Sequence, residues 1–211
     1  MRALSGLHCL TGCLAVVSLA ILSPSQIRAE NVTSIEEDWQ LDIDTPSSVR
    51  NSPQINCLTS TGAGIESQHA LFLVNEPGSE GGNLRLQLWN GDQLLATTDV
   101  PNTSAFLNTV GERINWTTRL SVSKGVLTAE VFNLSSDTWG NSSGKNSIAS
   151  VSAPTSLSDL SSYNPNVTCQ SSGVEFGNLR VQKLMLRKTR IYTGKQKSVE
   201  TSLERVVFQS K

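Results

Sequence analysis

Residues 111–140, GERINWTTRLSVSKGVLTAEVFNLSSDTWG, predict a long β-hairpin around which the rest of the chain can be arranged. Apolar and polar residues alternate over 114–122, which is the pattern of a strand with one buried face. Lys124-Gly125 supplies a two-residue turn, where glycine takes the positive φ of a primed turn. Pairing across this turn places Arg119 opposite Glu130, a favourable cross-strand charge pair. The other face is largely apolar and pairs Val122 with Leu127, Leu120 with Ala129 and Thr118 with Val131.

Further strands are predicted along the chain, each short and bounded by turn residues. Residues 70–74 are continuously apolar, residues 83–89 alternate, and Asn90-Gly91 is a strong hairpin signal. A slip in the alternation near Gln182-Lys183 predicts a β-bulge. The predicted strands are 39–43, 54–59, 70–74, 83–89, 92–99, 114–122, 126–133, 147–152 and 178–192, with one or two more within 167–176.

The arrangement of these strands predicts an all-β fold. Many short strands joined by turns, with no long helical pattern, are typical of an antiparallel two-sheet sandwich. Residues 30–211 show no internal repeat and no linker, and they are numerous enough to bury a sizeable core as one domain. We interpret residues 194–211 as a polar tail in which 206–208 is a candidate edge strand.

The first 29 residues have the features of a signal peptide. Arg2 is followed by an apolar run over 10–22, and Ile27 and Ala29 fit the −3 and −1 positions of a cleavage site. A transmembrane anchor is the alternative, but the run is shorter than the ~20 residues that a span needs. Lipidation at Cys13 is another alternative, although a lipobox should follow its apolar stretch and this one precedes it. We therefore expect a secreted protein (extracellular, periplasmic or cell-surface) with no membrane segment after cleavage.

Charge is modest overall but unevenly distributed. The chain has 17 basic and 18 acidic residues, and 15 basic residues remain once Arg2 and Arg28 leave with the signal peptide. Nothing in this balance points to nucleic acid or an anionic membrane as a partner. Residues 30–44 contain six acidic residues and no basic one, whereas residues 180–205 contain eight basic and two acidic ones.

Two cysteines, Cys57 and Cys169, remain after signal cleavage. As the one pair in an oxidising compartment they are expected to form a disulfide, which would close a loop of more than a hundred residues. In the chain-entropy model such a loop stabilises the fold by roughly 4–5 kcal/mol. Two separate buried thiols are the alternative.

The segment WTTRLSVSxGVLTxEVFN, followed by SxTWG, resembles strands of the concanavalin A-like lectin and glucanase superfamily, which includes laminin G-type domains. Residues 179–192 resemble the closing strand of such domains, and the whole chain resembles uncharacterised secreted bacterial proteins of this fold. The resemblance implies a jelly-roll sandwich whose first and last strands are neighbours. Opposite charges would then meet, so we predict that the strand around 39–43 pairs antiparallel with 184–191.

No catalytic group is predicted. Glucanases of this superfamily carry their acids as E-x-D-x-x-E on one strand, and that motif does not occur here. Glu36-Glu37-Asp38 are consecutive and alternate between faces, so we interpret them, like Glu200 and Glu204, as solvated charges. His69 has no G-x-S-x-G nucleophile to serve, and neither zinc spacing nor a phosphate-binding loop is present. We therefore expect no enzyme activity and no cofactor.

Sugar binding needs an exposed aromatic ring with polar groups around it. Trp89 shares a strand face with Arg85 and Gln87, which makes this face the predicted ligand site, although packing of the ring is the alternative. Trp139 follows a turn and fits either role, whereas Trp116 lies on the apolar face of its strand and is predicted to be core.

Calcium is the one metal that the sequence invites us to consider. Asp159, Asn164 and Asn166 faintly resemble the calcium loop of legume-type lectins. Calcium takes six to eight oxygens and usually more than one carboxylate, and only Asp159 is charged. These residues are therefore weak candidates, and no metal site is predicted.

Three functions stay open at this point. The first is a non-catalytic secreted binding or surface-interaction module, with an extracellular or cell-surface glycan as the candidate ligand. The second is a polysaccharide-active enzyme on the same fold, which the missing acid motif disfavours. The third is a purely structural extracellular domain.

Overall fold

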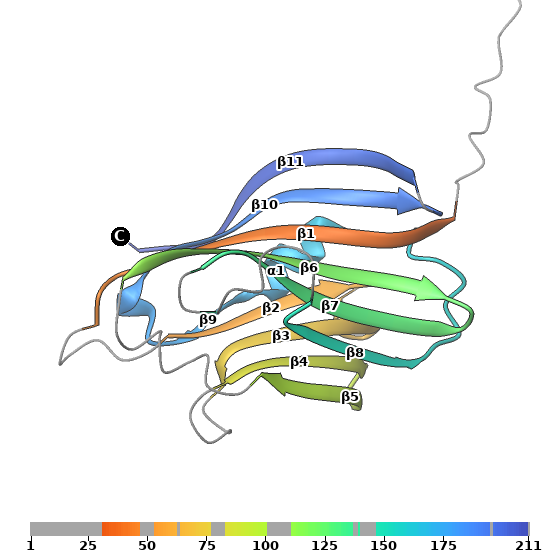
Figure 1. Cartoon of the computed structure of the whole chain (residues 1–211), viewed down its shortest axis with the longest axis horizontal. Helices are drawn as coiled ribbons and strands as arrows, with labels where there is room; N and C mark the ends of the chain where they lie inside the picture. The colour runs from red at the N-terminus through yellow and green to blue at the C-terminus, as the bar shows by residue number, and fades with distance from the viewer. Residues whose placement is uncertain are drawn as a thin grey trace, which may run out of the picture.

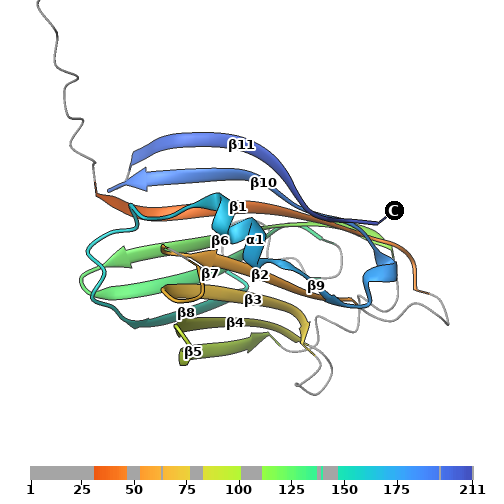
Figure 2. The same cartoon turned by 180° about the vertical axis from the view of Figure 1, so that it is seen from behind.

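The computed structural model describes residues 31–46, 53–62, 64–76, 83–100, 111–136, 139, 147–194 and 196–210. The predicted signal peptide, residues 1–29, lies outside this part of the chain. The described residues form two antiparallel sheets that face each other, with one short α-helix at their side (Figures 1 and 2). The predicted all-β sandwich is therefore confirmed. Within these residues no helix has the length and apolar character needed to cross a membrane.

The larger sheet has six strands in the order β11-β10-β1-β6-β7-β8. They are β1 (Val32–Ile43), β6 (Glu112–Ser123), β7 (Val126–Ser135), β8 (Ala149–Pro154), β10 (Val181–Thr193) and β11 (Gln196–Gln209). The smaller sheet has the order β5-β4-β3-β2-β9. It consists of β2 (Gln54–Ser60), β3 (Gln68–Glu76), β4 (Asn83–Asn90), β5 (Gln93–Val100) and β9 (Gly173–Phe176).

The central hairpin has the register that the sequence predicts. Arg119 lies opposite Glu130, and the apolar pairs Val122–Leu127 and Leu120–Ala129 form on the inner face. Both turn residues have positive φ, 50° at Lys124 and 73° at Gly125, as a primed turn requires. In the smaller sheet the predicted β4–β5 hairpin also forms, and its two loop residues are Gly91-Asp92 because Asn90 still pairs within the sheet.

The predicted antiparallel pairing of the strand around 39–43 with 184–191 is confirmed, although β11 follows β10, so the strand beside β1 is not the last one. β1 pairs antiparallel with β10, and Trp39 and Leu41 lie opposite Leu186 and Leu184. Gln182 is an extra residue between two paired positions, so the bulge also lies where the alternation slips. The predicted polar tail is more ordered than expected, since β11 runs for 14 residues along the outer edge of β10.

One segment differs in kind from the prediction. Residues 165–171 form helix α1 (Pro165–Ser171) instead of a strand, and β9 follows it. Asn164 caps the helix, with its side chain accepting a hydrogen bond from the Asn166 amide, and proline occupies the first turn. The helix has seven residues and buries only Thr168, so it has too few turns to show an apolar periodicity.

Four aromatic side chains join the two sheets in the core. Trp39 stacks on Trp116 with a centroid distance of 6.2 Å, and Trp139 packs on Trp116 at 5.4 Å. Phe72 reaches both from the smaller sheet, at 5.9 Å from Trp116 and 5.8 Å from Trp139. Trp116 is core as predicted, and Trp139 is also core because only 4% of it is exposed.

The cysteines contradict the predicted disulfide. Cys57, buried on β2, and Cys169, half-buried on α1, are both free thiols. The prediction used the number of cysteines and had no information on their geometry. Burial, followed by the negative charge of Glu37, raises the pKa of both thiols, to about 11 for Cys169 and well above the usual value for Cys57.

Candidate functional site

The outer face of the six-stranded sheet carries a row of carboxylates along β1. Glu36, Asp38 and Asp42 are two or four residues apart, so they share this face. Glu37 points inward and is fully buried. Our interpretation of residues 36–38 as solvated charges is therefore wrong: the outer pair is tied into ion pairs, and the middle residue belongs to the interior.

Arginines from both neighbouring strands bind these carboxylates. Arg190 of β10 donates to Glu36 at 2.7 Å and to both oxygens of Asp38 at 2.5 and 2.6 Å. Arg119 of β6 donates to Glu36 at 2.5 Å and lies 4.6 Å above the ring of Phe132. Because strand pairing places each arginine directly opposite Glu36, the network follows from the register.

The network lowers the pKa of Glu36, the most buried carboxyl of this face. Burial alone would raise the pKa of Glu36, but hydrogen bonds from Arg190, Arg119 and Tyr192 outweigh burial and bring the pKa below its ordinary value. Glu36 is therefore ionised at neutral pH. A general acid needs a raised pKa, so the most buried carboxylate of this face is unsuited to that role.

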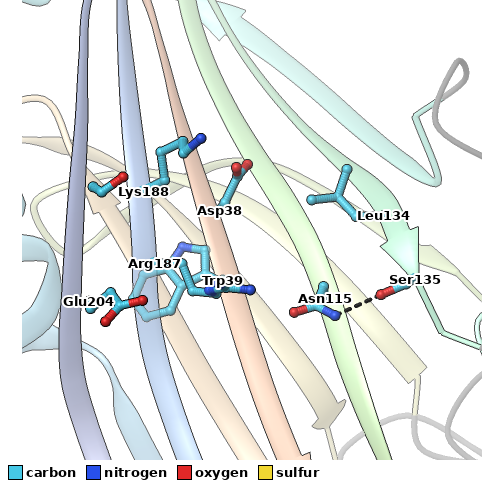
Figure 3. Close-up of a pocket in the computed structure, with 9 residues that line it drawn as sticks. Asp38, Trp39, Asn115, Leu134, Ser135, Arg187, Lys188 and Glu204 are labelled. Atoms are coloured by element: carbon cyan, nitrogen blue, oxygen red, sulfur yellow. Dashed lines mark hydrogen bonds between the residues drawn. The ribbon is translucent and has the colours of Figure 1, made fainter.

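Three hollows follow β1 along this outer face. The first, of about 370 Å³, is lined by Glu36 and Glu130, and a third of similar volume is lined by the ion pair of Asp42 and Arg113. The middle hollow has about 350 Å³ and extends from β11 across to β7 (Figure 3). Its lining is Asp38, Trp39, Asn115, Leu134, Ser135, Arg187, Lys188, Ser202 and Glu204.

Backbone irregularities shape the middle hollow. Arg187 is an extra residue in β10 between the pairs Asp38–Lys188 and Trp39–Leu186, and the bulge places its side chain among the lining groups. Glu204 has a φ of 42° at the register shift of β11 that faces Arg187, and it lines the hollow on the same side as Arg187 (Figure 3). The sequence shows the positive charge of 180–205 but not these two bulges, so this site was missed.

Asn115 is the lining residue with an unmet hydrogen-bonding capacity. Its amide nitrogen donates to the Ser135 hydroxyl at 2.6 Å (Figure 3). Its carbonyl oxygen is buried and has no hydrogen-bond partner among the described residues. A buried acceptor in this state costs about 1–3 kcal/mol, so a water or ligand donor that gains access to this oxygen would be stabilising.

The ligand site predicted from the sequence lies on the other sheet. Arg85, Gln87 and Trp89 share the outer face of β4, where Arg85 pairs with Asp99 at 2.7 Å and the Trp89 indole donates to Gln87 at 3.1 Å. Trp89 is half-buried and Gln87 is buried. Trp139, in the core, is separated from these three residues.

The side chains of the three weak calcium candidates already form hydrogen bonds within the protein. Asp159 accepts from the Ser161 amide at 2.9 Å, Asn164 caps α1, and Asn166 accepts a hydrogen bond from Arg205. Within the described ranges no group of three or more His, Cys, Asp or Glu side chains is placed to hold a metal ion.

Comparison with known proteins gives no assignment: no protein-family model matches the chain, and a search of curated proteins finds no match. The function is therefore argued from the geometry of the six-stranded outer face.

Proposed function

We propose that this chain is a secreted, non-catalytic binding module of the concanavalin A-like jelly-roll type, and that it binds a carbohydrate on the outer face of its six-stranded sheet. The observation that carries the proposal is the middle hollow, which the Asn115 amide lines together with hydroxyl and charged groups. The pairing of β1 with β10 supports the proposal, since the superfamily resemblance led us to predict it for residues 39–43 and 184–191.

A neutral, polyhydroxylated ligand fits the charge of this hollow. The lining carries two acids, Asp38 and Glu204, and two bases, Arg187 and Lys188, so the formal charge cancels. Asp38 and Lys188 are also already paired, with Arg190 and Glu200 respectively. The hollow therefore offers many hydrogen-bonding groups without a net field that would favour an ion.

Leu134 supplies an apolar wall. Leu134, at the end of β7, is 49% exposed, and its side chain faces the hollow beside Asn115 and Ser135 (Figure 3). A sugar ring has apolar C–H groups as well as hydroxyls, so a leucine beside an amide and a serine can contact both parts.

A binding role is also supported by the state of the carboxylates. Glu36 and Asp38 lie on one face of β1, but Arg190 bridges them and the pKa of Glu36 is lowered. Glycoside hydrolysis requires one carboxyl to stay protonated until it donates to the leaving group. This pair lacks that division of roles.

The test is a glycan array with the purified protein, followed by titration of each ligand that binds. Asn115→Ala should weaken binding by about 2- to 12-fold, the value of one neutral hydrogen bond. Trp89→Ala, on the other sheet, should leave the affinity unchanged. Binding that Trp89→Ala abolishes and Asn115→Ala spares would move the site to β4, and an array without any bound glycan would refute the proposal.

A further inference from the structure

The buried carboxyl of Glu37 has no role in the outer-face site. Position 37 shares the inner face of β1 with Trp39, and the side chain is fully buried. Three groups donate to it: the Thr59 hydroxyl of β2 at 2.6 Å, the Tyr163 hydroxyl at 2.7 Å and the Trp39 indole at 3.3 Å. Among the described residues no lysine or arginine forms an ion pair with it.

The Tyr163 contact belongs to a segment that covers one side of the sandwich. This segment, residues 155–172, is here called the strap, and it includes α1, which lies beside β2 (Figure 2). The Leu160 amide donates to the Val32 carbonyl of β1 at 2.8 Å, and the Ser172 hydroxyl accepts from the Leu58 amide of β2 at 2.9 Å. The strap therefore touches both sheets, and Glu37 is one of its anchor points.

Among the residues that the structure describes, the groups that face Glu37 supply no positive charge. Cys57 of β2, Tyr163 of the strap and Cys169 of α1 are its titratable neighbours, and Arg205 of β11 acts on Cys169. The residues paired with Glu37 across the sheet are uncharged: Thr118 of β6 and Thr189 of β10. An ionised Glu37 would thus be a buried anion held by neutral donors alone, which is costly.

We propose that Glu37 is a proton-controlled latch, which holds the strap closed over the sandwich while its carboxyl is neutral and loosens the strap when the carboxyl ionises. The neutral carboxyl can donate its own proton to the hydroxyl oxygen of Thr59 or Tyr163 and still accept from the remaining donors, so it needs no cation beside it. Opening of the strap lets water reach the carboxyl, which favours the ionised form.

The direction of the pH dependence follows from the burial. Desolvation raises the pKa of Glu37 above its ordinary 4.5, although the hydroxyl donors oppose this. A carboxyl whose pKa is raised in the closed state stabilises that state below about pH 4.5, and this contribution is lost as the pH rises through the raised pKa. Higher pH therefore opens the strap.

Hydrogen exchange of the full protein between pH 4.5 and 8, corrected for intrinsic exchange rates, tests the latch. Protection of the strap amides should fall by up to about tenfold per pH unit, the limit for one linked proton, while the β6–β7 hairpin stays unchanged. Glu37→Gln should remove this fall and raise strap protection at pH 8. Glu66→Gln, at an exposed position in the β2–β3 turn, should behave as wild type.

A second variant keeps the test decisive if Glu37→Gln does not fold. Tyr163→Phe retains the carboxyl and removes one donor to it, so the fall in protection should extend to higher pH. A wild-type strap whose corrected protection is independent of pH would overturn the latch. So would the same pH dependence in wild type and Glu37→Gln, or a fall in Tyr163→Phe that ends at the same or a lower pH.

Discussion

Arg190→Met tests how much the ion pairs of the outer face contribute to holding β1 against β10. Arg190 bridges Glu36 and Asp38 through three hydrogen bonds of 2.5–2.7 Å, and its side chain is only 18% exposed. Methionine keeps most of the aliphatic packing and removes the charge. The variant therefore removes the cation that Glu36 and Asp38 share, in a part of the surface that is largely buried.

The magnitude follows from what each carboxylate retains. Removing one partner of a buried ion pair costs about 3–5 kcal/mol. Glu36 still has Arg119, and Asp38 still has the Thr117 hydroxyl, so the cost should lie around the lower end of that range. We expect a loss of about 2–4 kcal/mol, which corresponds to a fall in Tm of about 4–16 °C for a domain of this size.

The same variant has a signature in pH. The folded-state pKa of Glu36 is depressed below 4.5, so its stabilisation is present above about pH 4.5 and is lost as the pH falls through the folded pKa. The difference in Tm between wild type and Arg190→Met, measured by circular dichroism, should therefore be largest near pH 7 and shrink below about pH 4.

Lys188→Met is the matched control, because Lys188 pairs with Glu200 on the same face but both side chains are about one-third exposed. That pair should contribute only about 0–1 kcal/mol. Equal destabilisation by the two variants, or a difference in Tm that does not change with pH, would refute a stabilising role of the Arg190 ion pairs between β1 and β10.

Two further predictions concern the thiols and a crowded glycine. Burial raises the pKa of Cys169 to about 11 and that of Cys57 well above its usual value, so both thiols should react slowly with iodoacetamide in the folded protein. Unreduced, unfolded protein without residues 1–29 should gain two labels by mass, and a mass without labels would mean a disulfide. Gly111→Ala should lower the free energy of unfolding by about 1–3 kcal/mol in chemical denaturation, since its new Cβ would lie 2.5 Å from the Thr45 backbone nitrogen. Gly173→Ala, whose Cβ would meet no atom within 4 Å, should be close to neutral.

The strands were predictable where alternation and turn chemistry agreed. The β6–β7 register followed from the positions of apolar residues relative to Lys124-Gly125, since a slip of one residue would have turned every apolar side chain to the solvent. The pairing of β1 with β10 followed from complementary charge and the superfamily resemblance. Neither argument requires knowledge of the contacts in the folded structure.

The candidate site was harder because it depends on irregular backbone. Bulges at Arg187 and Glu204 bring side chains to the middle hollow, and they interrupt the alternation from which faces are predicted. Glu37 is different, since its position was readable: Trp39 and Leu41 occupy the same alternation and are core. We assigned the Glu37 carboxyl to the surface because it is charged, although its position in the alternation of β1 places it on the buried face.

The position of β1 within its sheet has a consequence for the order of folding. β1 is flanked by β6 and by β10, and its pairing with β10 joins residues as distant as Val32 and Thr193. Contacts of such separation close large loops and slow the search for the native state. During synthesis β1 remains without β10 until residues 181–193 have emerged, so the earliest strand of the sandwich is among the last to gain its full set of neighbours.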